Sequence, residues 1–269
     1  MGLSAMGGRV TMTVVTTVLI ALTFSSAAAA AGPDVSRDLI TPGTLLVGSD
    51  IPFPPFEFGT PPRYKGFDID MVNAMARKLQ LRVKYVDTDF DTIFNSVGHG
   101  KFDLVAAAAT ITPERRKVVA FSRPYYDAQQ SLVVKRGSGI RSVRGLAGRT
   151  VSAQWSTSGE WFARNKTRAA KVIGFSTGPA AVRAVNTGRA AAAVVDSVFA
   201  TYSLKSKWTG LRVARNISVG ERYGFAMSKD SIRLRKGINW AFNRIRADDT
   251  FKRLYRKWFG TAPPPSLRR

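Results

Sequence analysis

Strand and helix signals alternate along this chain of 269 residues, and the alternating pattern occurs twice. Such alternation is typical of the α/β class, in which helices cover a mostly parallel sheet. Short apolar or alternating segments indicate strands, and longer segments that are apolar on one side indicate helices. We expect strands at 45–49, 82–86, 103–107, 131–135, 150–153, 171–175, 191–195 and 223–227, and helices at 67–79, 90–97, 159–165, 179–186, 232–246 and 250–258.

The restart of the pattern after the third strand predicts two lobes, with a return segment near the C-terminus. The chain would cross between the lobes twice, near 127–131 and near 221–224. We expect the first lobe at 38–128 plus 224–261 and the second lobe at 129–223. Both are of ordinary size for an α/β unit.

Residues 1–31 predict a secretory signal peptide that is cleaved. Arg9 is the only charge, an apolar run covers 10–24, and small residues cover 25–31. An uncleaved membrane anchor is the alternative, but it needs about 20 apolar residues. The run here is shorter and contains threonines. We therefore expect a periplasmic or extracellular protein that begins near residue 31 or 32.

The chain contains no cysteine and one histidine. Without a thiol it cannot be a lipoprotein, and thiol, Ser-His-Asp, zinc and nucleotide chemistry lack their residues. His99 lies in a predicted turn between two glycines, where we expect it to face solvent. No cofactor and no metal site are expected.

The net charge is strongly positive, with 41 Lys and Arg residues against 18 Asp and Glu residues. Such an excess raises the question of a polyanionic partner. The basic residues are scattered over predicted helix faces, and no nucleic-acid motif accompanies them. We interpret the charge as a solvated surface suited to anionic envelope polymers or lipid, and we expect no nucleic acid as a partner.

The segment 101–127 carries a site signal, because an apolar strand with small residues at its end leads directly into a short helix. Thr112 is placed as the N-cap of this helix, and Pro113 is placed at its first position. Arg115 follows one turn later, where its guanidinium could hold a carboxylate through two parallel hydrogen bonds. The alternative for Arg115 is a surface salt bridge with Glu114 or Asp127.

Three motifs in order resemble the periplasmic binding proteins of amino-acid ABC transporters, of the glutamine, histidine and lysine/arginine/ornithine type. They are GFDIDMVNAMARKL at 66–79, the segment 101–127 and the terminal KWFG at 257–260. The resemblance implies a type II two-lobed periplasmic-binding-protein fold with a ligand cleft between the lobes. It also implies a monomer that captures a polar or basic L-amino acid and delivers it to an ABC permease in the cytoplasmic membrane.

Two other functions stay open at this point. Some relatives of this fold are dehydratases, so a periplasmic enzyme acting on a small carboxylate is the alternative, with Asp50, Asp196 or a lysine in the cleft as acid or base. Related two-lobed domains also serve as sensors on receptors. We expect a binding protein rather than an enzyme.

The resemblance implies a set of ligand-binding residues in the first lobe. Two aromatic rings would flank the ligand, a run of small residues would approach its α-groups, and Arg115 would hold its carboxylate. Core packing is the alternative role for the two aromatic rings. The set in this lobe is Asp50, Phe53, Phe90, Ala107, Ala108, Thr110 and Arg115.

The second lobe would complete the site from two segments. AQWSTSGEW at 153–161 supplies Gln154, and it supplies Thr157 and Ser158 at a helix start, where unpaired N–H groups favour an anion. Asp196, after the strand 191–195, would pair with the ligand's ammonium; its alternative role is to cap the helix that begins near Val198.

Two features of the site bear on specificity. Trp155 and Ser156 stand where the family commonly has Ser-Gly, which puts the local backbone path in question. Asp50 has no counterpart in an apolar ligand and would be costly to desolvate alone. Unless Asp50 is paired with Arg63 or Lys65, a basic or amide side chain is expected on the ligand.

Overall fold

The computed structural model describes residues 1–3, 7 and 32–268, and Gly32–Arg269 form one compact unit. The signal peptide expected at 1–31 falls almost wholly outside the described residues. Within the described part of the chain, no helix combines the length and apolar character needed to cross a bilayer.

The first sheet has five strands in the order β4-β1-β5-β12-β6. β1 runs parallel to both β4 and β5, whereas β12 is antiparallel to its neighbours. A hairpin of β2 and β3 follows the loop after β1. The strands are β1 (Thr44–Ser49), β2 (Phe58–Thr60), β3 (Arg63–Lys65), β4 (Arg82–Asp87), β5 (Leu104–Val105), β6 (Ala120–Phe121) and β12 (Ala226–Met227).

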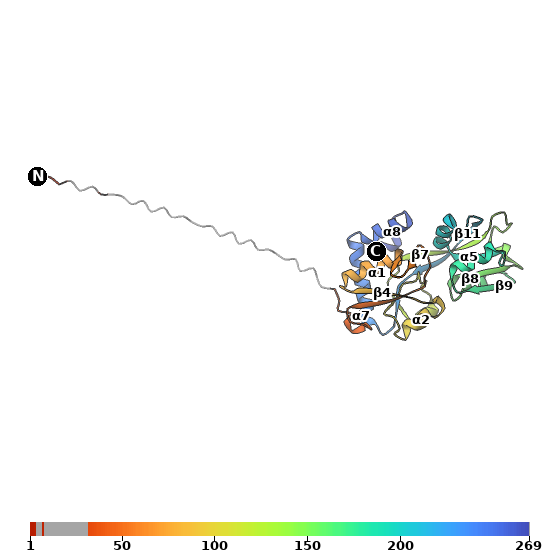
Figure 1. Cartoon of the computed structure of the whole chain (residues 1–269), viewed down its shortest axis with the longest axis horizontal. Coiled ribbons are helices and arrows are strands. Elements are labelled where there is room, and N and C mark those ends of the chain that lie inside the picture. The colour runs from red at the N-terminus through yellow and green to blue at the C-terminus, as the bar shows by residue number, and fades with distance from the viewer. Residues whose placement is uncertain (4–6, 8–31, 269) are drawn as a thin grey trace. The chain divides into compact units, whose positions relative to one another are not determined.

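Five α-helices belong with this sheet. α1, α7 and α8 pack on one another, and Met71, Met75 and Phe242 are fully buried between them and the sheet. α2 buries Ile93 and Val97 in a separate apolar cluster with Val105. Figure 1 shows α1, α7 and α8 gathered near the C-terminus and α2 apart from them. The helices are α1 (Phe67–Lys78), α2 (Phe90–Gly98), α3 (Pro113–Val118), α7 (Ile232–Ala247) and α8 (Thr250–Phe259).

The second sheet also has five strands, in the order β11-β7-β10-β8-β9. Successive residues of β7 are buried on opposite faces: Leu132 and Val134 join one apolar cluster and Val133 joins another. Helices therefore cover both faces. The elements are β7 (Tyr126–Lys135), β8 (Thr150–Gln154), α4 (Ser158–Lys166), β9 (Lys171–Phe175), α5 (Gly178–Asn186), β10 (Ala192–Asp196), α6 (Ser197–Ser206) and β11 (Leu211–Tyr223).

β7 and β11 carry the chain between the two lobes. They are antiparallel, and Tyr126 pairs with Tyr223 at the end nearer the first sheet. The expected two-lobed α/β fold with two crossings is confirmed. The crossings are a pair of hydrogen-bonded strands, so the lobes share a two-stranded hinge (Figure 1).

Two predicted strands are shorter than expected, and one long strand was not predicted. The third strand covers only Leu104–Val105, because the chain turns at Ala108, whose φ is +44°. The late strand expected at 223–227 is reduced to β12, and Tyr223 belongs to β11 instead. β11 itself was not predicted: its polar, glycine-containing sequence gains strand structure by pairing with β7.

Candidate ligand-binding cleft

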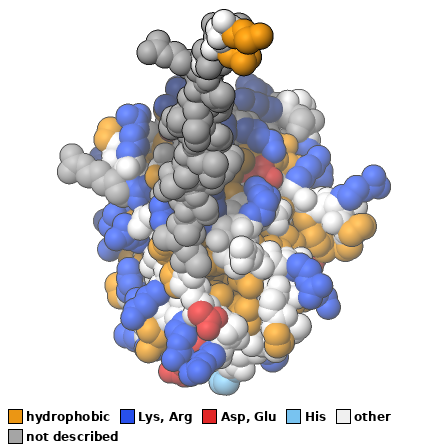
Figure 2. Space-filling view, turned by 90° about the vertical axis from the view of Figure 1, so that its left-hand side faces the viewer, with side chains coloured by type: hydrophobic (Ala, Val, Ile, Leu, Met, Phe, Trp, Pro, Cys, Tyr) orange, Lys and Arg blue, Asp and Glu red, His pale blue; other side chains and the backbone are white. Residues whose placement is uncertain are grey.

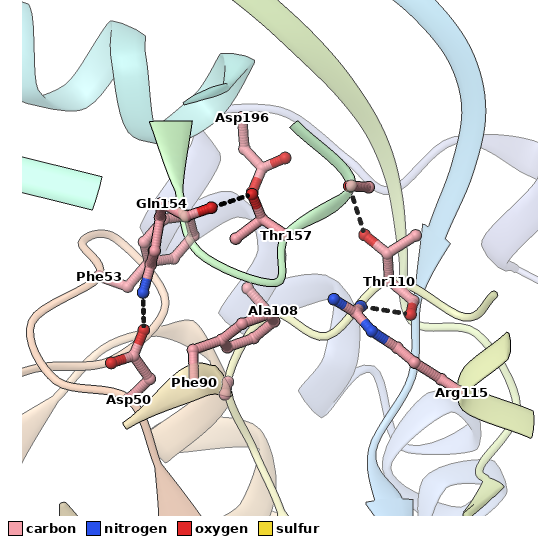
Figure 3. Close-up of a pocket in the computed structure, with 11 residues that line it drawn as sticks. Asp50, Phe53, Phe90, Ala108, Thr110, Arg115, Gln154, Thr157 and Asp196 are labelled. Carbon is pink, nitrogen blue, oxygen red and sulfur yellow. Dashed lines mark hydrogen bonds between the residues drawn. The ribbon is translucent and has the colours of Figure 1, made fainter. Parts of the chain in front are cut away.

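The eleven residues predicted for the site all line one cavity of about 300 Å³ between the lobes. Figure 3 shows Asp50, Phe53 and Gln154 on one side of this cavity and Thr110 and Arg115 on the opposite side. The cavity is thus polar at both ends. The strand ends of both sheets meet here, as is usual for ligand sites in α/β proteins.

Asp50 follows β1, and its carboxylate accepts a hydrogen bond of 2.6 Å from the side-chain amide of Gln154 at the end of β8. The same amide donates to the carbonyl of Ser176 at 3.0 Å. The alternative partners of Asp50, Arg63 and Lys65, make no ion pair with it among the described residues. Burial raises the pKa of Asp50 to about 7, and Asp87, Asp89 and Asp91 add to the shift.

Arg115 lies in α3, which begins as predicted: the Thr112 side chain accepts a hydrogen bond of 3.1 Å from the N–H of Arg115. Its guanidinium donates to the carbonyl of Thr110 at 2.7 Å and to the carbonyl of Ser156, in the other lobe, at 3.0 Å. No ion pair with Glu114 or Asp127 forms in the described structure. Arg115 therefore lines the cavity and does not form the surface salt bridge that was its alternative role.

α4 begins at the cavity with Thr157 as its N-cap. The Thr157 hydroxyl accepts from the N–H of Glu160 at 3.1 Å and donates to the carbonyl of Gln154 at 2.8 Å. Within the described part of the chain, the N–H groups of Thr157 and Ser158 donate to no other residue. Unpaired N–H groups at a helix start favour an anion, and the side chain of Thr157 lines the cavity (Figure 3).

Asp196 occupies the N-cap position of α6, as its alternative role predicted, but its side chain makes no capping hydrogen bond. Instead it accepts a hydrogen bond from the side-chain amide of Gln130. Burial raises the pKa of Asp196 to about 7, and the nearby carboxylate of Glu221 raises it further. Burial also lowers the pKa of Arg115 to about 10, although Glu221 and Asp196 oppose this shift.

The two aromatic rings have different surroundings. Phe53 stacks on Phe199 of the second lobe, with ring centroids 4.8 Å apart. Phe90 lies under the guanidinium of Arg115 at 5.0 Å, and Phe94 lies under it at 4.4 Å. Both predicted rings are more than 90% buried and still line the cavity. Phe90 thus supports Arg115, whereas Phe53 packs across the two lobes against Phe199.

Trp155 does not line the cavity. Its side chain is 45% exposed and packs over Gly174 of β9, where an added Cβ would meet the indole at 1.8 Å. The neighbouring Ser156 adopts φ +59° and presents its carbonyl to Arg115. The departure from Ser-Gly therefore changes the outer wall of the lobe and leaves the cavity lining intact.

Sequence reasoning missed two acidic residues at the site. Glu221 of β11 accepts hydrogen bonds from Ser158 at 3.0 Å and from Gln130 at 3.1 Å. Asp68, fully buried at the start of α1, accepts from the N–H of Ala108 at 3.0 Å and from Tyr125 at 2.7 Å. The hydrogen bond to Asp68 therefore stabilises the left-handed backbone conformation of Ala108. An acidic residue in the first turn of the GFDID helix was the available signal.

The fold and the site define a class of protein. Two α/β lobes joined by a two-stranded hinge enclose a polar cavity, and residues of both lobes close it through direct hydrogen bonds. This is the architecture of proteins that trap a small solute by closing around it.

Comparisons with known proteins agree with this class. The family model "Bacterial extracellular solute-binding proteins, family 3" matches residues 45–261. The ABC transporter glutamine-binding protein GlnH of Bacillus subtilis (strain 168) is 29% identical over 204 residues, 74% of each chain. An ancestral arginine-binding protein solved with arginine is 37% identical, with a TM-score of 0.77, over 81% of this chain and 99% of that one. The arginine-, lysine-, histidine-binding protein ArtJ of Geobacillus stearothermophilus is 27% identical, with a TM-score of 0.78, over 84% of this chain and 99% of that one.

The chain belongs to family 3 of the bacterial extracellular solute-binding proteins. It is an extracytoplasmic binding protein for an amino acid and serves an ABC transporter, as the sequence motifs predicted. Family and relatives are binding proteins of transporters and not enzymes, and the dehydratase alternative has no better support.

Proposed function

We propose that the cleft binds a basic L-amino acid, with arginine, lysine, ornithine and histidine ahead of glutamine, and that the closed form delivers it to the permease. The observation that carries this proposal is Asp50. It is 8% exposed, lines the end of the cavity opposite Arg115, and has a neutral amide, Gln154, as its side-chain partner. An ionised carboxylate in this position gains a second, charged partner when a cationic side chain enters.

The α-carboxylate would lie against Arg115 and the unpaired N–H groups of Thr157 and Ser158, with the Thr110 hydroxyl beside them. A guanidinium and two backbone donors match the two oxygens of one carboxylate. The α-ammonium would lie against Asp196 and near Glu221, while the backbone at Ala107 and Ala108 forms the floor. The two α-groups would thereby join the lobes, because Arg115 lies in α3 of the first lobe and Asp196 ends β10 of the second.

A basic ligand must approach a chain of net charge +22 once Arg9 is removed with the segment 1–31, because 40 Lys and Arg residues then stand against 18 Asp and Glu residues. Asp87, Asp89 and Asp91 stand near Asp50 and give this end of the cleft a local negative field. Long-range repulsion is screened over about 8 Å at physiological salt, and it affects the association rate more than the affinity. The local carboxylates therefore favour a cation. ArtJ, a relative described as binding arginine, lysine and histidine, supports the same choice.

We further propose that the protein acts as a monomer after removal of the segment 1–31, without a lipid anchor. In this proposal its first lobe spans 38–128 plus 224–261, and its second lobe spans 129–223. Size-exclusion chromatography with light scattering, and mass spectrometry of the exported protein, test these points.

A thermal-shift screen of the chain from residue 32 against the twenty amino acids and ornithine tests the proposed ligand. A ligand that binds only the folded protein raises the Tm, and tighter binding raises it more. Arginine, lysine, ornithine and histidine should therefore raise the Tm most. The largest shift with glutamate, aspartate or leucine would overturn the proposal.

A further inference from the structure

A second concavity lies outside the cleft and shares no residue with it. It has a volume of about 830 Å³ and lies between the end of α7, the outer side of α8 and the C-terminal segment. Four cationic side chains from these three segments line it, with one carboxylate and one buried ring: Arg246, Lys252, Arg256, Arg268, Asp249 and Phe251. Apart from these, its lining is the small apolar Ala262 and Pro263.

The four cationic side chains lie close together although like charges repel one another. Lys252 and Arg256 lie one turn apart on α8, a spacing at which like charges destabilise a helix. Arg246 stands over the ring of Phe242 at 5.3 Å. Its pKa is lowered, first by burial and then by the charge of Arg123. The crowding favours an anion that relieves the repulsion.

The charges within the concavity are only partly compensated. Asp249 pairs with Lys252 at 3.8 Å, but both side chains are largely exposed. Arg268 donates its Nε–H to the carbonyl of Pro263 at 2.7 Å. The guanidinium of Arg256 makes no hydrogen bond or ion pair with any residue in the described part of the chain. The concavity therefore presents guanidinium groups that a multivalent oxyanion can bridge.

We propose that this concavity, lined by Lys252, Arg256 and Arg268 beside Arg246, is a second binding site, for a phosphate group. Guanidinium groups bind phosphate through paired hydrogen bonds, and several cations around one hollow suit an anion of more than one charge better than a single carboxylate. The positive charge of the whole chain draws polyanions to the surface. Figure 2 shows Lys and Arg side chains spread over the face in view, with few Asp or Glu. The concavity then holds one phosphate in a defined place.

The test compares two variants of equal charge. One replaces Lys252, Arg256 and Arg268 by alanine; the control replaces Arg141, Arg144 and Lys171, which are exposed on the other lobe. Inorganic tripolyphosphate binding is measured by calorimetry at low salt, and thermal unfolding checks that both variants fold. The site variant should bind at least tenfold more weakly, and the control should stay within twofold of the wild type. Equal weakening in both variants, or no binding by the wild type, would overturn the proposal.

A second arm distinguishes the source of the phosphate. Vesicles of phosphatidylglycerol and phosphatidylcholine are sedimented with the wild type and both variants. If the wild type and control bind the vesicles and the site variant does not, the phosphate belongs to a lipid headgroup. If only tripolyphosphate shows the site-specific loss, the phosphate belongs to a soluble or polymeric anion. Vesicle binding that falls equally in both variants, together with equal loss for tripolyphosphate, would reduce the effect to total charge and contradict the site.

Discussion

The side-chain amide of Gln154 and the carboxylate of Asp50 form a buried hydrogen bond of 2.6 Å that joins the two lobes. The two residues are 104 positions apart in the chain, and each closes the end of a strand in a different sheet. Because the amide is neutral, it orients the carboxylate without neutralising it. Asp50 thus joins the two lobes, and in the proposed function it also recognises a cationic side chain.

We expect Asp50→Asn to weaken arginine and lysine binding by about 10- to 100-fold, the range that corresponds to one hydrogen bond to a charged group, about 1.5–3 kcal/mol. The affinity for glutamine, which has a neutral side chain, should change less than about threefold, because its hydrogen bond to residue 50 is not charge-assisted on the ligand side. Isothermal calorimetry with the three ligands measures the ratio. Asp230→Asn, which removes an exposed carboxylate that does not line the cavity, is the matched control. An equal loss for arginine and glutamine would show that Asp50 does not read the side chain.

Arg115→Lys should weaken binding at least about tenfold, although the charge is kept, because an ammonium cannot offer the two parallel hydrogen bonds of a guanidinium. Arginine amide, which lacks the α-carboxylate, completes a double-mutant cycle. The substitution should hardly change its already weak binding. If Arg115→Lys weakens the binding of arginine and of arginine amide by the same factor, the guanidinium stabilises the fold and does not bind the ligand's carboxylate.

These two residues also mark what the sequence could reveal. The Thr112 cap and the placement of Arg115 depend on neighbours within one helical turn, and both were confirmed. The extents of α1, α2 and β9 likewise follow from local apolar periodicity. Asp50 was predicted to need a partner, but its partner Gln154 lies in the other lobe, and only the tertiary fold brings them together.

Glu221 escaped prediction for a related reason. It lies in β11, a strand whose outer residues are mostly polar and half exposed, so no apolar run announces it. Pairing with β7 makes this segment a strand and carries the carboxylate to Ser158 and Gln130. The length of β5 was overestimated because the chain turns at Ala108, where the N–H donates to Asp68, a residue forty positions earlier in the sequence.

Ligand affinity should rise with pH between 6 and 8. Asp50 and Asp196 each have a pKa of about 7 in the ligand-free protein, so below pH 7 a cationic ligand must displace a proton from each. Each carboxyl should reduce affinity about tenfold between pH 8 and pH 6. Arginine Kd values measured by calorimetry at pH 6, 7 and 8 check this expectation. An affinity independent of pH would mean that both carboxyls are ionised before binding.

Stability of the ligand-free protein should change in the opposite direction. The pKa values of Asp68 and Asp196 are about 7 in the folded state and near 3.8 when unfolded. Between these values the folded state binds more protons, so the free energy of unfolding falls as pH rises toward 7, by up to about 1.4 kcal/mol per unit for each group. Urea unfolding at pH 5.5 and 8.0 measures it. Asp68→Asn should reduce the dependence, and a stability that increases with pH would contradict the account.

Glu221→Gln should shift the pH profile of arginine binding toward lower pH. Burial is the main cause of the raised pKa of Asp196, and the charge of Glu221 is the next. Removing that charge lets Asp196 ionise at lower pH. The readout is the ratio of Kd values at pH 6 and pH 8, which should become smaller in the variant. A parallel loss at both pH values would limit Glu221 to holding Ser158 and Gln130.

The proposed recognition of a cationic side chain is tested most directly by comparing arginine with citrulline. The two ligands have nearly the same shape and identical α-groups, but the side chain of citrulline is neutral. Isothermal calorimetry of the chain from residue 32 at pH 8 should show arginine binding at least about tenfold more tightly, as one charge-assisted hydrogen bond to Asp50 requires. Equal affinities, or tighter binding of citrulline, would contradict the assignment of Asp50 to a cationic side chain.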